Sequence, residues 1–177
     1  LKPNFVEAYS NLGLILKDLG NLQEAELSYR KAIKLKPDFA IAHSNLGNVL
    51  NDLGNLQEAE LSYRKAIKLK PDFAKAHGNL GNILSNLGNL EAAELSYRKA
   101  IALNPDYAKA HNNLGVILKN LGNLKEAEIF TRKAIKLNPN FVEAYANLGG
   151  ILRALGKLED GRICSEKIMS IRSWSIL

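Results

Sequence analysis

The chain has 177 residues, of which 46% are hydrophobic and 24% are charged. This balance is typical of a globular protein and excludes the disordered and collagen-like classes. A membrane span needs about 18 consecutive apolar residues, and Gly, Asn or a charged residue interrupts each stretch of Leu and Ile before that length. Cys164 is the single cysteine, which excludes an internal disulfide and a cysteine-based zinc site. We therefore expect a cytoplasmic protein with no membrane contact.

The formal net charge of +6 suggests a nucleic-acid-binding protein, but the excess is local. Residues 108–141 hold six basic and two acidic residues, whereas 6–39, 40–73 and 74–107 are each neutral. Four arginines each follow a glutamate by four residues, the spacing at which opposite charges pair along a helix. These pairs are Glu26/Arg30, Glu60/Arg64, Glu94/Arg98 and Glu128/Arg132. We expect no nucleic-acid partner.

A repeat of 34 residues organises the chain, since prolines fall at positions 3, 37, 71, 105 and 139. Residues 19–39 and 53–73 are identical in sequence. Such a period is typical of a repeat architecture in which each unit is one supersecondary structure. The predicted organisation is the tail of a preceding repeat at 1–5, repeats at 6–39, 40–73, 74–107 and 108–141, and a degenerate repeat with an apolar C-terminal tail at 142–177.

Each repeat is predicted to form two helices. Asp38 is a candidate N-cap for the first, which ends at Gly54, a residue suited to the left-handed turn that closes many helices. Asn55 with Glu58 then resembles a capping box for the second, and Pro71 stops it. Apolar residues of the first helix recur three and four positions apart, as on one helical face; they are Ala42, Leu46, Val49, Leu50 and Leu53. We expect helices near 5–19 and 21–36, and again every 34 residues.

The pattern resembles the tetratricopeptide repeat family. Each repeat has a large ring-bearing residue near its start, then Leu-Gly, an alanine, an aromatic residue, a second alanine and the proline. The matching residues of the second repeat are His43, Leu46-Gly47, Ala59, Tyr63, Ala66 and Pro71. The resemblance implies an all-α fold, a right-handed α-solenoid (superhelix) of antiparallel helix pairs with a concave groove lined by the first helices. Gly47 is expected to let the helices of a pair approach closely, against a small residue such as Ala59.

The fifth repeat departs from this pattern, with Gly161 and Ser165 where alanine and an aromatic are expected, and Ser173 in place of proline. The sequence then ends in an apolar segment, although terminal repeats of solenoids usually present a polar outer face. We expect the chain to be part of a longer protein. The segment from Ile168 to Leu177 is expected to be covered, either by folding onto the last hairpin or by self-association.

The sequence offers no candidate catalytic residues, cofactor site or metal site. His43, His77 and His111 recur every 34 residues. They occupy the position of a packing aromatic, and helices of successive repeats lie about 8–10 Å apart, too far for one metal ion to gather all three. The glycines have structural roles in and between the helices. The sequence contains no phosphate-binding glycine loop and no Ser-His-Asp motif. We therefore expect a protein that is not an enzyme.

A polar stripe on the first helices carries the functional prediction. Asparagine recurs on it in every repeat, although asparagine is a mediocre helix former, while the neighbouring stripe positions vary. We call these five residues the asparagine ladder: Asn11, Asn45, Asn79, Asn113 and Asn147. An amide both donates and accepts hydrogen bonds, so a ladder of amides can pair with the backbone of an extended peptide.

The ladder resembles that in the repeat domain of O-linked N-acetylglucosamine transferase, which implies peptide binding by the ladder in the groove. Asn48 and Asn82 extend the stripe, and Lys75, Lys109 and Lys119 would favour acidic side chains. Duplication of near-identical repeats is the competing explanation for the recurring asparagine. We therefore predict a protein-interaction scaffold. The alternative is the substrate-recognition arm of a larger enzyme, such as a glycosyltransferase or sulfotransferase.

Overall fold

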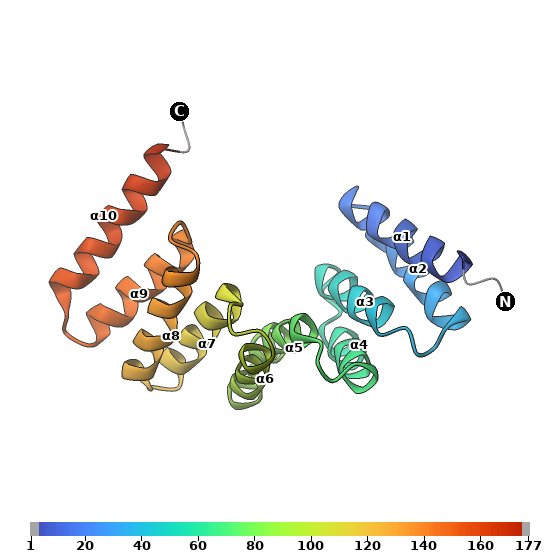
Figure 1. Ribbon diagram of the computed structural model, residues 1–177, viewed down its shortest axis with the longest axis horizontal. Helices are drawn as coiled ribbons and strands as arrows, with labels where there is room; N and C mark the ends of the chain where they lie inside the picture. The colour runs from blue at the N-terminus through green and yellow to red at the C-terminus, as the bar shows by residue number, and fades with distance from the viewer. Residues whose placement is uncertain (1–3, 175–177) are drawn as a thin grey trace. The chain divides into compact units, whose positions relative to one another are not determined.

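The computed structural model describes residues 4–174, and within this range it contains ten α-helices and no strand. In chain order they are α1 (Asn4–Asp18), α2 (Leu22–Leu35), α3 (Ala40–Asp52), α4 (Leu56–Leu69), α5 (Ala74–Asn86), α6 (Leu90–Leu103), α7 (Ala108–Asn120), α8 (Leu124–Leu137), α9 (Val142–Ala154) and α10 (Leu158–Trp174) (Figure 1). The predicted all-α class and the two helices per repeat are confirmed.

Backbone contacts divide the chain into two units. Unit one, Leu1–Gly88, holds α1 to α5, and unit two, Asn89–Leu177, holds α6 to α10. Within each unit every helix packs on the next in the chain, and the first helices also contact one another: α1 with α3, α3 with α5, and α7 with α9. The first-helix layer is thus α1, α3 and α5 in unit one and α7 and α9 in unit two. The remaining helices form the second-helix layer. This serial stacking is that of an α-solenoid.

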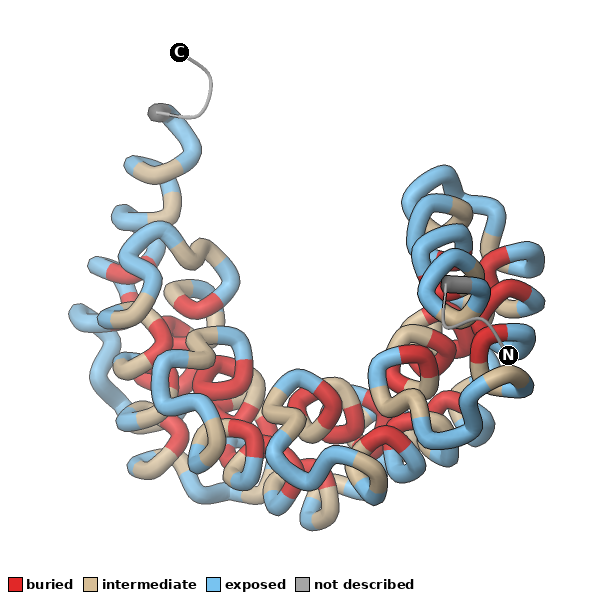
Figure 2. Tube along the Cα trace, turned by 45° about the vertical axis from the view of Figure 1, so that its right-hand side comes forward, coloured by how far each residue is buried: buried red, intermediate tan, exposed pale blue. Residues whose placement is uncertain are grey.

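The core of each unit consists of residues on the facing sides of the helices (Figure 2). Small residues allow the close approach, and Ala25, Ala59 and Ala66 are all fully buried. Large aliphatic residues of the first helices fill the space between them, including Leu50 and Ile83. The predicted apolar face of α3 is therefore the packed face.

The turn within each pair and the approximate helix bounds follow the prediction, but the side-chain caps do not. Gly54 has φ 81°, a left-handed conformation that glycine adopts at no steric cost. The predicted N-cap at Asp38 is wrong, because Phe39 holds the N-cap position of α3. Asn55 does hold that position in α4, but it makes no side-chain capping hydrogen bond. Its ψ of 64° lies outside the extended region that a capping side chain ordinarily requires.

The atoms nearest to Gly47 belong to an aromatic ring. A Cβ at Gly47 would lie 2.9 Å from the Tyr63 ring, so the ring occupies the place that a side chain would take. The packing of Gly47 against Ala59 stays a prediction. In the fifth repeat Gly149 faces Cys164 instead, at an ordinary 3.4 Å from the same hypothetical Cβ.

The four predicted Glu–Arg pairs form within the second helices, with N–O distances from 2.7 to 2.9 Å. Two further pairs join successive second helices, and a third joins α8 to the turn before α10. Arg30 reaches Glu58 at 2.7 Å, Arg98 reaches Glu126 at 2.8 Å, and Lys157 reaches Glu128 at 2.7 Å.

The apolar C-terminal segment continues α10, which has 17 residues where α8 has 14. Met169 on this helix is 64% exposed, so the expected covering of the segment is not found at this residue. Ser175, Ile176 and Leu177 lie outside the described residues. Among the helices of the described part of the chain, none combines the length and apolar character that crossing a membrane requires.

The three repeated histidines each bond a proline carbonyl through Nε2, at 3.0 Å for His43 and His77 and 2.8 Å for His111. His111 differs because it is only 4% exposed and stacks on Phe130, with ring centroids 5.8 Å apart. Burial lowers the pKa of His111 below its ordinary value, an effect that the Pro105 carbonyl opposes and Lys133 reinforces.

The lowered pKa of His111 predicts acid sensitivity. As the pH falls below about 6.5, the unfolded chain binds a proton at this position before the folded chain does, so the free energy of unfolding decreases. Once the pH is below the pKa of His111 in the folded protein, both states are protonated and the free energy of unfolding falls no further for this reason. The replacement His111→Tyr introduces the residue type found at the equivalent position of the fifth repeat, Tyr145. It should make the free energy of unfolding less dependent on pH. Urea unfolding between pH 7.5 and 5 measures it; the same pH dependence in parent and variant would contradict the assignment.

Candidate functional site

The asparagine ladder lies along the first-helix layer of both units. Asn11, Asn45 and Asn79 come from α1, α3 and α5 of unit one, and Asn113 and Asn147 from α7 and α9 of unit two. Asn11 is exposed and the other four are half-buried. Each unit thus presents its ladder amides on adjacent helices, as predicted.

In unit one, part of the ladder is hydrogen-bonded within the protein. The Tyr63 hydroxyl donates to Asn48 Oδ1 at 2.7 Å, and Asn79 Nδ2 donates to the same oxygen at 2.9 Å. Asn48 therefore links the second helix of one repeat to the first helix of the next. Asn48 and Asn79 therefore both have hydrogen-bond partners within the fold.

Unit two has a related network around Asn112, a residue outside the predicted site. Asn147 Nδ2 donates to Asn112 Oδ1 at 3.0 Å, and Asn112 Nδ2 donates to Asn113 Oδ1 at 3.1 Å. Asn113 is also hydrogen-bonded to Tyr97. Asn112 is only 4% exposed. The sequence could have pointed to Asn112, because the equivalent position in the other four repeats holds a small residue: Ser10, Ser44, Gly78 and Ala146.

The first repeat lacks this network. Leu14 replaces the asparagine found at position 48, and the fully buried Tyr29 hydroxyl has no hydrogen-bond partner among the described residues. Burial, with a smaller contribution from Asp18, raises the pKa of Tyr29 to about 12. Asn11 and Asn45 likewise make no side-chain hydrogen bond within the described part of the chain. These two amides are free to bind a ligand.

The contrast between the two tyrosines gives a prediction. Tyr63→Phe removes a hydrogen bond and leaves Asn48 with one donor fewer, so it should lower the free energy of unfolding by about 1–2 kcal/mol. Tyr29→Phe removes a hydroxyl that has no partner, and it should be neutral or stabilising. Urea unfolding of both variants measures the difference. Equal losses would contradict the network.

Charged side chains flank the ladder differently in the two units. In unit one, Lys17 pairs with Asp52 at 3.1 Å. Lys119 is the equivalent of Lys17 in unit two, but Ala154 replaces the acidic partner. Lys119 Nζ instead lies 3.5 Å from where a Cβ of Gly150 would be, and it has no ion pair within the described residues.

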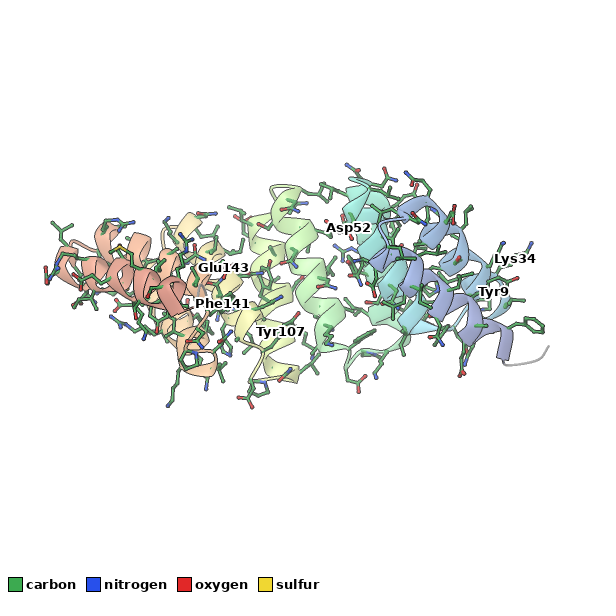
Figure 3. The ribbon with its side chains drawn as sticks, turned by 90° about the horizontal axis from the view of Figure 1, so that it is seen from above. Tyr9, Lys34, Asp52, Tyr107, Phe141 and Glu143 are labelled. Carbon is green, nitrogen blue, oxygen red and sulfur yellow. The ribbon has the colours of Figure 1, made fainter. Side chains whose placement is uncertain are left out.

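The other predicted cations are also available. Lys75 begins the stripe on α5 and Lys109 begins it on α7, and both are exposed and unpaired within the described range. Asn82 is exposed on α5 and takes part in an interaction of its own. Glu143 is an exposed acid in the first turn of α9 (Figure 3). The stripe of unit two therefore combines two free cations with one carboxylate.

The stripe consists of groups that can bind a ligand through hydrogen bonds and charge. The described residues contain no group of three or more His, Cys, Asp or Glu side chains that could hold a metal ion. The groups on the stripe are amides, ammonium groups and single carboxylates, which supply hydrogen bonds and charge complementarity.

Comparisons with known proteins identify the repeats. Models described as TPR repeat match residues 13–54, 47–88 and 81–122, and models described as tetratricopeptide repeat match 108–141 and 130–162. No curated protein matches the chain. A crystal structure of MamA has 26% identity and a TM-score of 0.84, with 93% of this chain and 96% of that chain covered.

Two further solved structures are similar. YrrB, described as a TPR protein with an unusual peptide-binding site, has 25% identity and a TM-score of 0.76, covering 93% of this chain and 85% of that chain. The Pseudomonas aeruginosa protein pilF has 24% identity and a TM-score of 0.87, covering 94% and 76%, and this likeness concerns the fold alone. With family models matching almost the whole length, the chain belongs to the tetratricopeptide repeat family.

Proposed function

We propose that this chain is a protein-interaction module that holds an extended peptide segment of a partner on its first-helix layer. The observation that carries the proposal is the arrangement of the ladder amides, one on each first helix, with Asn11 exposed and the other four half-buried. The likeness to YrrB, which is described as having a peptide-binding site, supports it. Backbone recognition by amides holds a segment with little dependence on its sequence.

The internal hydrogen bonds prepare the ladder for this role. An asparagine has two N–H donors and an oxygen with two lone pairs. Asn79 and Asn147 each use one N–H on a neighbouring amide, so one donor and the oxygen are left for a ligand. Because the bonded amide has lost rotamer freedom before binding, less conformational entropy is lost when a peptide binds. Asn11 and Asn45 keep their full hydrogen-bonding capacity.

The charges suggest which peptides bind best. Lys109 and Lys119 in unit two have no carboxylate partner among the described residues, so an acidic side chain of the ligand can supply one. Charge complementarity of this kind adds selectivity to contacts that the backbone makes in any sequence. We therefore infer a preference for acidic segments along α7 and α9.

The alternative role is the substrate-recognition arm of a larger enzyme, such as a glycosyltransferase or sulfotransferase. The same groove and the same residues would then hold the protein substrate, and the full-length reading frame distinguishes the two roles.

The proposal is tested by selecting peptides that bind the protein and then locating their binding site by NMR. Peptides selected from a displayed library of random dodecapeptides would be titrated into the ¹⁵N-labelled protein, with the asparagine side-chain amide signals observed by NMR. We expect the signals of Asn11 and Asn45 to shift most. Peptide-induced shifts confined to the second-helix layer would overturn the proposal.

A further inference from the structure

Each unit has a cavity between two successive second helices and the first helix that lies between them in the chain, and no asparagine of the ladder lines it. In unit one it is bounded by α2, α3 and α4, with a volume of about 460 Å³. In unit two it is bounded by α8, α9 and α10, with a volume of about 490 Å³. Each position lining the first cavity recurs in the second, three repeats later. The repeat thus builds the same cavity twice.

The two cavities share an apolar interior and a basic rim. In unit two the interior includes Leu148, Leu152 and Cys164, which belong to one buried cluster. Lys136 on α8 and Lys167 on α10 stand at the rim, exposed and without an ion pair within the described residues. Their equivalents in unit one are Lys34, labelled in Figure 3, and Lys65.

An ion pair distinguishes the unit-one cavity. Arg30 and Glu58 both line it, and they join α2 to α4 at 2.7 Å. Arg30 is also bound to Glu26, at 2.7 Å, so its charge is fully compensated. The rim of this cavity is therefore bridged by protein groups.

The unit-two cavity lacks this bridge. Arg132 pairs with Glu128 on its own helix at 2.9 Å, and Glu128 is also held by Lys157 at 2.7 Å. Asp160, which occupies the position of Glu58, has no ion pair among the described residues. Its side chain is one methylene shorter than that of Glu58. The rim therefore remains open, and the two unpaired ammonium groups of Lys136 and Lys167 and the unpaired carboxylate of Asp160 stand beside an apolar interior.

We propose that the α8–α9–α10 cavity binds an acidic peptide segment of a partner, which inserts one bulky apolar side chain and places carboxylates beside Lys136 and Lys167. A buried apolar anchor ringed by charge complementarity is the usual composition of an energetically important contact. Ile163, which is 52% exposed at this cavity, supplies further apolar surface next to the anchor. This site is separate from the ladder and does not rest on the proposed function.

The test uses fluorescein-labelled Glu-Asp-Phe-Leu-Asp-Glu with an amidated C-terminus as the probe, followed by fluorescence anisotropy. Lys136→Glu with Lys167→Glu should weaken binding at least tenfold. The matched control, Lys34→Glu with Lys65→Glu, makes the same charge change at the bridged cavity and should alter affinity less than twofold. Equal weakening in both variants would show that only net charge matters and would overturn the proposal.

Cys164 locates the bound peptide, because it is the only cysteine of the sequence and lines this cavity. Burial raises the pKa of the Cys164 thiol, so alkylation by iodoacetamide would be followed at pH 8.5. Saturating probe should slow the alkylation several-fold, whereas the same peptide with Ser-Ser in place of Phe-Leu should not. An alkylation rate unchanged by the probe would also overturn the proposal.

Discussion

Replacing Gly47 by alanine should lower the free energy of unfolding by about 1–3 kcal/mol, the usual cost of overpacking a core. In an exposed helix the same change stabilises by about 1 kcal/mol, because alanine is the better helix former. At Gly47 the new methyl group would lie 2.9 Å from the Tyr63 ring, which is itself held by the hydrogen bond to Asn48. The ring cannot withdraw without breaking that bond.

The fifth repeat supplies the control for this substitution. Gly149 occupies the equivalent position, but Ser165 replaces the tyrosine, and a Cβ would meet Cys164 at 3.4 Å. Gly149→Ala should therefore be neutral or stabilising by up to about 1 kcal/mol. Urea unfolding of both variants measures the contrast. If Gly47→Ala were as stable as Gly149→Ala, the proposed contact between Gly47 and Tyr63 would be wrong.

Replacing Asn11 and Asn45 together by alanine should weaken binding of a selected dodecapeptide by roughly 30- to 150-fold. That range corresponds to about 2–3 kcal/mol, the sum of a few hydrogen bonds to the peptide backbone. Neither amide has a partner among the described residues, so the fold loses no hydrogen bond. Isothermal titration calorimetry measures the affinity, and thermal melts of the same samples should show no loss of stability.

Leu27→Ala with Leu61→Ala is the matched control, because both leucines are exposed on the second-helix layer, at 59% and 67%. It should leave peptide affinity unchanged. Asn79→Ala should differ from both variants, since it removes the donor to Asn48 and should lower stability by about 0.5–1.5 kcal/mol along with affinity. Unchanged affinity in the Asn11/Asn45 variant would show that these amides do not bind the peptide.

The helical architecture could be predicted because local signals and the repeat agree. The 34-residue period, the apolar faces and the glycine turns each indicate the same helix pairs. The helix starts were less predictable, because a side chain such as Asp38 can cap a helix only if the backbone places it at the N-cap. The structure puts Phe39 there instead.

The ladder positions were predictable from the stripe, but their hydrogen-bond partners were not. The bond from Asn79 to Asn48 joins residues 31 positions apart. Whether two such amides meet depends on how successive repeats are rotated, which periodicity does not specify. The bridge from Arg30 to Glu58 depends on the same packing, and so does the isolation of Lys119 beside Gly150. The cavities between successive second helices also arise from this packing, and no sequence motif predicts them.

The central claim is that amides on the first-helix layer bind the backbone of an extended peptide. The most direct measurement compares the affinity of a selected dodecapeptide with that of its copy N-methylated at alternate residues, which keeps every side chain and removes backbone donors. We predict at least a tenfold loss on N-methylation, and a much smaller loss in the Asn11→Ala/Asn45→Ala variant, where those contacts are already absent. Equal affinity of the two peptides for the parent protein would contradict the account.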